Sequence, residues 1–365
     1  MFKILKNAAV ITLIMTLFSC GEFTGWKDDD SPDIGSATEV KLHLSESDLY
    51  KLYETVSIDE SVPCSVSIGS WYGYGNLKVR GYTSRMHAKK SFMLKVDDRK
   101  YVLERGHLSG GIGNRIAMRA YQMAGLPACD TETIGLFLND EYLGCYNLIT
   151  YYDEDTLDGE LYKIFFDDYD HMENNHPLSS LSEKKFPDNN DMSNLEHLIA
   201  ALTTKNDRDW NDFVNKNVDI EKFVAYLAVH DFLMVEDTFS TNYYICYDGK
   251  YYFLPWDNEQ CLGSPFSEYD LGGDNQLVRR LVAVPQVKDA YNQKMKELFL
   301  DGGEGCILPE LRTEAEKMLA DASEAVRSDP NYKDEFNDFL VYANTVRYFL
   351  SAKGRCSVLS DPVLK

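Results

Sequence analysis

Short hydrophobic runs, several of them alternating with polar residues, dominate the chain from Val40 to Ile149. They are broken by Gly, Pro and Asn, and they include SVPCSVSI, NLKVRGYTS, KKSFMLKV, TIGLFLND and EYLGCYNLIT. Alternation with a period of two over four to eight residues predicts half-buried β-strands. We therefore expect an antiparallel sheet in this region, with a hairpin turn at Asn139-Asp140.

A helical period interrupts the strands once and then dominates the second half of the chain. In GIGNRIAMRAYQMAGLPA, apolar residues recur every three to four positions, and Gly125 ends the period. In DIEKFVAYLAVHDFLMVED, we expect Asp219 to cap a helix that ends near Met234. QLVRRLVAVPQVKDAYNQKMKELFL, LRTEAEKMLADASEAVRSD and KDEFNDFLVYANTVRYFLSAK have the pattern of further amphipathic helices.

An acidic, loop-like stretch, YYDEDTLDGELY, separates the two patterns. We place a boundary there, between a sheet-rich part at 40–155 and a mainly helical part at 156–365. Strands, one helix and then strands is the element order of a kinase N-terminal lobe. Many other α+β domains share that order.

The first residues have the layout of a bacterial export signal. In residues 1–19, Lys3 and Lys6 precede an apolar run that is too short for a comfortable membrane span. Ser19 directly before Cys20 resembles the lipobox at which bacterial lipoproteins are cleaved and diacylated, so we expect a lipid on Cys20. An ordinary secretory signal with an incidental cysteine is the alternative.

The stretch after the signal is rich in Gly, Pro and Asp and shows no strand or helix period, so residues 20–39 are expected to form a flexible acidic tether. An acidic cluster so close to Cys20 also resembles the surface-export signal of Bacteroidota lipoproteins. We therefore expect the protein to be exported and held by lipid in the bacterial cell envelope, at the outer membrane or cell surface.

The overall charge limits the partners. The formal net charge is −22, and removal of the signal would take away two more lysines and no acids. Nucleic acid and anionic membrane surfaces repel such a protein, so the N-terminal lipid is the one membrane contact we expect. The cysteines after Cys20 show no CxxC and no matched Cys/His spacing, which argues against structural zinc, and their odd number argues against a fully paired disulfide framework.

Polar residues gather around one candidate hairpin, TNYYICYDGKYYFLPWDNE. Asp248-Gly249 between two Tyr-rich runs predicts a two-residue type I′ turn. In that register Asn242 faces Pro255 and lies diagonally from Asp257 on the same face. Asp237 precedes Asn242 at the D-x-x-x-x-N spacing with which protein kinases place a catalytic Asp and a metal-binding Asn. Mg²⁺ takes such oxygen ligands, although Asp and Asn also cap helices and build turns.

Several motifs together resemble the CotH family of spore-coat and secreted atypical protein kinases. VEDTFSTNYYICYDGKYYFLPWDNEQCLG resembles the family's Asp and Asn ahead of a hairpin that closes with Trp-Asp. KVRGYTSRMHAKKSFMLKV resembles its Arg-Gly-Asn-Ser-Ser and Lys-Lys-Ser-Tyr blocks, and MAGLPACDTETIGLFLNDEYLGCYNL its Gly-x-Pro-Ala and Asn-Gly-x-Tyr segments. The resemblance covers roughly residues 40–300. It implies an atypical two-lobed protein-kinase-like fold, with an antiparallel-sheet N-lobe containing one helix and a mainly helical C-lobe containing the metal-site hairpin.

The same resemblance implies transfer of the ATP γ-phosphate to a Ser or Thr of a protein substrate, with Mg or Mn. It makes Asp237 the catalytic Asp that accepts the proton of the substrate hydroxyl, and Asn242 and Asp257 the metal ligands. A lysine that pairs with phosphates is expected in KKSFMLKV, where alternation groups Lys90 with apolar residues and favours it over Lys89. Both are otherwise solvated lysines at the start of a strand.

The remaining nucleotide contacts are expected in two places. Arg80, Gly81 and Ser84 lie in a Gly-rich region where backbone N–H groups and an arginine would meet phosphates. Thr150 stands near the expected hinge, where the family usually has an acid. Two further departures are Gly113, in place of an arginine before Asn114, and Glu259, as the second acid after Trp-Asp.

Two other functions remain open from the sequence. A catalytically weak or inactive kinase-like surface lipoprotein would bind glycan or protein, and the many aromatic residues permit a surface on which sugars stack. A metal-dependent hydrolase would use the same acids. Its weakness is that the histidines show neither HExxH nor another paired metal-ligand spacing.

Overall fold

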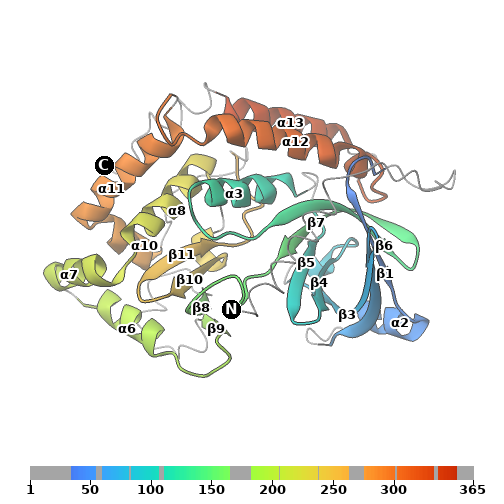
Figure 1. Cartoon of the computed structure of the whole chain (residues 1–365), viewed down its shortest axis with the longest axis horizontal. Coiled ribbons are helices and arrows are strands. Elements are labelled where there is room, and N and C mark those ends of the chain that lie inside the picture. Colours follow the sequence, from blue (N-terminus) through green and yellow to red (C-terminus); the bar gives the residue numbers. More distant parts are fainter. Residues whose placement is uncertain are drawn as a thin grey trace, which may run out of the picture.

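The computed structural model describes residues 34–54, 60–81, 84–106, 111–164, 182–204, 206–236, 238–262, 275–300, 302–332 and 336–351. The expected signal at 1–19, most of the tether, Cys20 and Asp237 lie outside the described residues. A barrel occupies one end of the molecule, a smaller sheet lies at its centre, and helices cover the other end and one long side (Figure 1).

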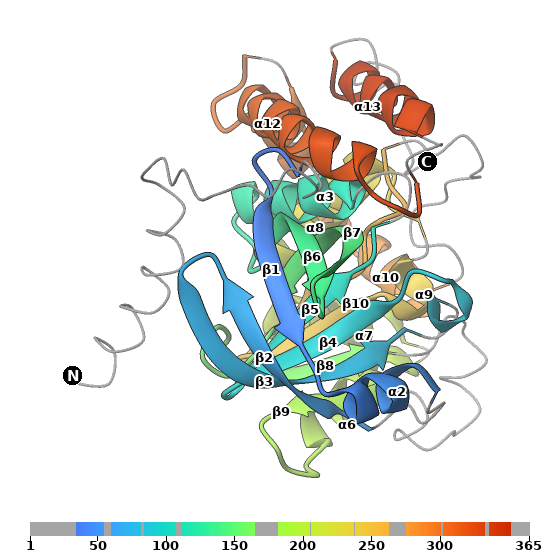
Figure 2. The same ribbon diagram turned by 90° about the vertical axis from the view of Figure 1, so that its right-hand side faces the viewer.

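Seven strands close into the barrel (Figure 2). They are β1 Thr38–His43, β2 Val62–Ile68, β3 Trp71–Arg80, β4 Ser91–Val96, β5 Arg99–Glu104, β6 Thr131–Leu138 and β7 Glu141–Thr150. Around the barrel their order is β1-β2-β3-β4-β5-β7-β6, and β1 returns to β6 as a parallel neighbour. Alternate side chains such as Val40, Leu42, Leu77 and Phe92 fill the interior, as the period-two pattern predicts.

The expected two-lobed kinase-like fold, with an antiparallel-sheet N-lobe and one helix, is wrong. The finding that overturns it is the closed barrel, because the parallel β1–β6 pair joins the edges that an open antiparallel sheet would leave free. Within the described residues of this part, two α-helices, α2 (Glu46–Glu54) and α3 (Ile112–Met123), and the short helix η1 (Ser84–Met86) are present rather than one helix. Alternation shows which face of a strand is buried but not which strand lies beside it, so the closure was not predictable from the pattern.

A second sheet has the order β11-β10-β8-β9 and is antiparallel throughout. Its strands are β8 Glu160–Ile164, β9 Ser182–Phe186, β10 Tyr243–Tyr247 and β11 Tyr251–Pro255. One face of this sheet packs against barrel residues in a separate core that contains Val102, Ile149, Tyr244, Leu254 and Trp256. The two sheets therefore meet at a continuous buried layer.

Helix α8 (Ile220–Leu233) lies at the centre of the helical part and is buried along almost its whole length. Asp219 caps it by accepting a hydrogen bond from the Lys222 N–H, and Met234 ends it in a left-handed conformation, both as the sequence predicts. The other helices are η1 Ser84–Met86, α6 Ser193–Leu202, α7 Asp207–Asn217, α9 Thr238–Thr241, α10 Gln276–Val282, α11 Pro285–Phe299, α12 Leu308–Arg327 and α13 Phe336–Leu350.

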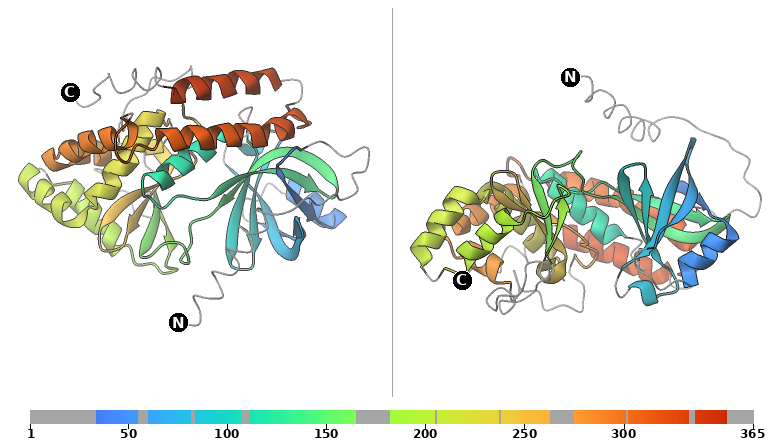
Figure 3. Two further views of the ribbon diagram at one scale, coloured as in Figure 1. Left: turned by 45° about the horizontal axis from the view of Figure 1, so that its top comes forward. Right: turned by 90° about the horizontal axis from the view of Figure 1, so that it is seen from below.

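Helix α12 joins the two halves of the molecule. It runs along the helical part, packs on α3 and reaches β6 and β7 of the barrel (Figure 3). Within the described residues no helix has the length and apolar character that a membrane span requires. The six described cysteines are free thiols, and all but Cys306 are buried.

The predicted hairpin at residues 243–255 is present, but its register differs by one residue from the prediction. Tyr247 pairs with Tyr251 and Tyr243 with Pro255, so the loop has three residues, 248–250, and Gly249 takes a positive φ. Continued outward, this register would put Asn242 opposite Trp256 rather than Pro255. A shift of one residue exchanges the two faces of a strand, so the argument that placed Asn242 and Asp257 on one face fails.

Candidate metal centre

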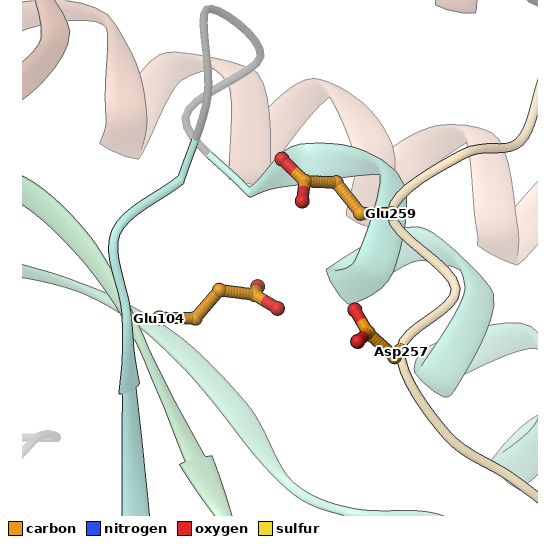
Figure 4. A group of neighbouring side chains, drawn as sticks. All are labelled: Glu104, Asp257 and Glu259. Carbon is orange, nitrogen blue, oxygen red and sulfur yellow. The ribbon is translucent and has the colours of Figure 1, made fainter. Parts of the chain in front are cut away.

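Three carboxylates converge where the barrel meets the second sheet (Figure 4). Glu104 is the last residue of β5, and Asp257 and Glu259 lie in the segment that follows β11. One oxygen from each lies within 4.8 Å of the others. Oxygen ligands on opposite sides of one divalent cation are about 4–5 Å apart, so the spacing suits a single ion.

Glu104 is buried and is held by two amides. Asn114, in the first turn of α3, donates to both Glu104 oxygens at 3.3 and 3.2 Å, and Asn147 of β7 donates to Oε2 at 3.0 Å. Burial, helped by the charges of Glu259 and Asp257, raises the pKa of Glu104 to about 8, against the effect of the two amides. Glu104 therefore keeps its proton at neutral pH unless a cation takes its place.

The other two acids are fixed by a tight contact with the start of α3. Asp257 takes a positive φ of 57°, and the Asn258 N–H donates to Asn114 Oδ1 at 3.3 Å. A Cβ at Gly113 would lie 2.6 Å from the Glu259 carbonyl oxygen. Any side chain at position 113 would displace this segment. Glycine at that position therefore allows the chain near Glu259 to lie against α3.

Unpaired amide atoms next to the cluster fit a metal ion. Asn258 is fully buried, and within the described part of the chain neither its Oδ1 nor its Nδ2 has a hydrogen-bond partner. The same holds for Oδ1 of Asn147. Each such atom costs about 1–3 kcal/mol when it stays unsatisfied. Amide and carboxylate oxygens are the ligands that hard divalent cations take, so the residues present suit Mg²⁺ or Mn²⁺.

Basic side chains lie near Asp257. The Arg80 guanidinium, at the end of β3, stacks over Trp256 with its carbon 5.4 Å from the ring centroid. Lys163 pairs with Tyr244, and Tyr244 pairs with Leu254, so Lys163 shares the face of the second sheet that carries Trp256. Arg80 and Lys163 thus approach the same face from the two sheets.

The charge on Lys163 depends on this neighbourhood. Burial, together with the charges of Arg80 and Lys185, lowers the pKa of Lys163 to about 8, while Asp257 and Glu183 oppose the shift. An anion bound between these cations would raise the pKa of Lys163 again. Acids that suit a metal and cations that suit phosphate therefore stand side by side.

The predicted lysines have different surroundings. Lys89 is 5% exposed and is paired with Asp329 at 2.6 Å. Lys90 is half-buried, and its ammonium donates to the Arg85 carbonyl oxygen. Alternation groups Lys90 with the apolar residues, but β4 begins only at Ser91 and Lys89 is the more buried of the two. That Lys90 pairs with phosphate stays a prediction.

The other predicted site residues are dispersed. Asn242 donates its N–H to the Thr238 carbonyl oxygen at 2.9 Å, and Thr150 Oγ1 accepts from the Asp130 N–H at 2.9 Å. Gly81 has a φ of 103°, directly after Arg80, and Ser84 opens η1. Of the predicted residues, the structure brings Arg80 and Asp257 to the acid cluster.

Sequence reasoning missed Glu104 and Lys163. Each had a local signal, because Glu104 closes the apolar strand segment YVLE and Lys163 interrupts the apolar run LYKIFF. A charged residue at a strand position that should be buried is an indication of a functional site. The spacing argument used only residues close to one another in the chain, and Glu104 reaches the site through the fold.

Comparison with known proteins gives one clear match. No curated protein matches the sequence. Similar solved structures include the Helicobacter pylori proinflammatory kinase CtkA, at 11% identity over 74% of this chain and 94% of that one, with a TM-score of 0.30. Another is the open conformation of CtTel1, at 12% identity over 82% of this chain and 12% of that one, with a TM-score of 0.35. These scores are too low to support an argument about fold or function.

The match to a protein family is stronger than these structural similarities. The family described as CotH kinase protein matches residues 77–302, which is more than half of the chain and includes all three acids of the cluster. The chain belongs to the CotH kinase family.

Proposed function

We propose that the protein is a protein kinase that transfers the γ-phosphate of ATP to a Ser or Thr of a protein substrate, with Mg²⁺ or Mn²⁺. The observation that carries the proposal is the cluster of Glu104, Asp257 and Glu259 beside the cations Arg80 and Lys163. Family membership supports the same reaction class.

Each group has a defined task in this proposal. Glu104, Asp257 and Glu259 would hold the ion. Asn258, whose buried amide oxygen suits a metal, lies between the last two acids in the chain. When bound, the ion supplies neutralisation of the negative charge on the phosphate oxygens. Arg80 and Lys163 would bind phosphate oxygens beside the acids and so orient the nucleotide.

The proton of the substrate hydroxyl needs an acceptor, and the proposal gives that task to Asp237, with Asn242 as a further oxygen ligand. Both assignments rest on the D-x-x-x-x-N spacing and on the family. Asp237 lies outside the described residues. Its role is therefore tested by Asp237→Asn, which should abolish transfer while metal binding stays within about threefold of wild type, because the acid cluster is intact.

Transfer itself is tested with the purified protein, ATP labelled on the γ-phosphate, and Mg²⁺ or Mn²⁺, with the protein itself and acidic proteins as acceptors. Asp257→Asn should reduce labelling by at least about 100-fold, because it removes a metal ligand. The matched control is Asp140→Asn, an equal change at an exposed carboxylate in the β6–β7 turn. Absence of labelling by wild type, although it binds Mn²⁺, would refute kinase activity.

A second candidate has one observation in its favour. Tyr72 and Tyr74 are exposed neighbours on the outer face of β3, with ring centroids 5.4 Å apart. Exposed aromatic pairs of this kind suit sugar stacking. Binding to a glycan array that is lost in Tyr72→Ala/Tyr74→Ala and unchanged in Asp257→Asn would support a glycan-binding surface protein without catalysis.

The location in the cell envelope is also part of the proposal and rests on the N-terminal sequence alone. Cys20 should carry a diacylglyceryl group in the protein isolated from a bacterial host. Mass spectrometry of the N-terminal peptide tests this modification. Cys20→Ser should release the protein from the membrane fraction, and an unchanged membrane fraction would refute lipid anchoring at Cys20.

A further inference from the structure

A buried ion pair lies at the same end of the barrel as the acid cluster but is not part of it. Lys89, just before β4, and Asp329, just after α12, have side chains that are 3% and 1% exposed, and Nζ and Oδ2 are 2.6 Å apart. Lys89 also donates to the Cys145 carbonyl oxygen at 2.5 Å and lies over the rings of Tyr146 and Tyr332. Burial lowers the pKa of Lys89, and the charge of Asp329 opposes this.

Asp329 is fully hydrogen-bonded inside a bend of β7. Its Oδ2 also accepts the Cys145 N–H at 2.8 Å, and its Oδ1 accepts the backbone N–H of Asn331 at 2.9 Å. Asn331 in turn donates to the Leu143 carbonyl oxygen at 3.1 Å. A Cβ at Gly144, where φ is 118°, would lie 2.2 Å from the Asp329 carboxylate, so glycine makes room for the acid.

Strand β7 links this contact to the metal centre, because Cys145 and Asn147 both lie in it. Two residues beyond Cys145, Asn147 donates to Glu104 Oε2. A Cβ at Gly111, at the start of α3, would lie 2.9 Å from Cβ of Asn147, so the residue has little freedom to move. On the other side, Ser91 Oγ accepts the Arg105 N–H at 3.0 Å, which fixes the residue after Glu104 to the strand that Lys89 precedes.

We propose that Lys89 and Asp329 are positioning residues for the metal centre: they fix β7 at Cys145 and thereby hold Asn147 against Glu104. The inference rests on the proposed metal site. It also gives a task to Asp329, which lies beyond the family match at 77–302. Partners of metal ligands typically change metal affinity by 10–100-fold when they are altered, without touching the ion.

Metal affinity separates positioning from simple stabilisation. Mn²⁺ binding to the folded protein is measured by electron paramagnetic resonance for wild type, Asp329→Asn and Asn147→Ala. Both variants should raise the Kd for Mn²⁺ by at least about 10-fold, because Asn147→Ala removes the hydrogen bond from Asn147 to Glu104 Oε2 and Asp329→Asn loosens it. A lowered melting temperature with an unchanged Kd in Asp329→Asn would overturn the inference.

The matched control is Glu310→Gln, which removes the exposed Arg119–Glu310 pair between α3 and the first turn of α12. It loosens the same helix at its other end, so the Kd for Mn²⁺ should stay within about twofold of wild type. If Asp329→Asn does not fold, Asn331→Ala removes the bond to Leu143 and keeps the ion pair. It should raise the Kd by a smaller factor, and an unchanged Kd in it and in Asn147→Ala would overturn the inference.

Hydrogen exchange distinguishes failure of this inference from failure of the proposed function. If wild type binds no Mn²⁺, the metal site and the function built on it fail. Asp329→Asn should still increase exchange at the amides of 145–147 and 104–106, because the contact that fixes them is lost. Unchanged exchange there would overturn the positioning role itself.

Discussion

Two clusters of charged residues lie at one end of the barrel, one fully buried and one only partly buried, and they differ in how their charges are compensated. Lys89 and Asp329 form a pair of opposite sign, with hydrogen bonds to most of their polar atoms. Glu104, Asp257 and Glu259 form a group of one sign, with orphaned amide atoms beside it. The charges of the first cluster neutralise each other within the protein, whereas the buried Glu104 of the second has a raised pKa beside two further acids.

The difference shows how a structural polar cluster is told from a functional one. Burial of a single charged residue does not distinguish them, because Lys89, Asp329 and Glu104 are all at most 7% exposed. Compensation does, because a protein rarely buries an acid beside two further, partly exposed acids unless a ligand offsets the cost. Experiments that remove or supply the neutralising charge in each cluster therefore test this difference between them.

The largest effect is expected from pH in the metal-free protein. Folded Glu104 keeps its proton up to about pH 8, whereas the unfolded carboxyl loses it near pH 4.5. Between these values the folded state binds more protons, so stability falls as pH rises, by up to about 5 kcal/mol. Glu104→Gln should lack this component. Urea unfolding from pH 5 to 8 with a chelator measures the difference, and parallel curves for the two proteins would contradict it.

The next largest effect comes from breaking the paired cluster. Lys89→Met leaves the Asp329 carboxylate buried without its partner, which should destabilise the protein by about 3–5 kcal/mol. Lys89→Met/Asp329→Asn should be more stable than Lys89→Met alone, because no unpaired charge remains. Denaturant unfolding at pH 7 gives both values. A double variant that loses the sum of the single losses would show that the two residues are not coupled.

A smaller effect is expected from filling the acid cluster. Mn²⁺ at 100 times its Kd should raise the stability by about 2.7 kcal/mol if it binds only the folded state. The melting temperature with and without Mn²⁺ measures this at pH 7. Asp257→Asn should abolish the rise, and the exposed control Asp140→Asn should keep it. A rise of the same size in both variants would place Mn²⁺ elsewhere.

The smallest effect concerns the contact between α3 and the acid segment. Gly113→Ala would place a Cβ 2.6 Å from the Glu259 carbonyl oxygen, so the segment must shift. We expect a loss of about 1–3 kcal/mol in stability and a raised Kd for Mn²⁺. Gly125→Ala is the control for added bulk without a close neighbour, although its positive φ adds strain. A Gly113→Ala variant with the wild-type Kd would show that this contact does not shape the metal centre.

Local patterns predicted the elements well and their arrangement poorly. Asn139 and Asp140 both have positive φ, as the expected tight turn requires, and Asp219 caps α8. The closure of the barrel by β1 and β6 depends on residues 96 positions apart, which no local period reports. The hairpin register was also predicted wrongly. The loop at 248–250 has three residues rather than two, and Asp-Gly alone does not determine the loop length.

The site shows the same division. Asp257 was found because it ends a recognisable hairpin motif, and Arg80 because it follows one strand into a Gly-rich turn. Glu104 was missed because its partners Asp257 and Glu259 lie more than 150 positions away in the chain. Lys89 was ranked below Lys90 because its partner Asp329 lies 240 positions away, and burial of a lysine depends on such a partner.

The same separation has a consequence for the order of assembly. The Lys89–Asp329 contact closes a loop of 240 residues, one of the longest in the molecule, and loops of that length close late because little enthalpy is gained before their ends meet. A nascent chain that has emerged as far as α11 already contains every acid of the cluster and all seven barrel strands, yet lacks the residue that secures β7. The metal centre should therefore mature last, when synthesis has passed α12.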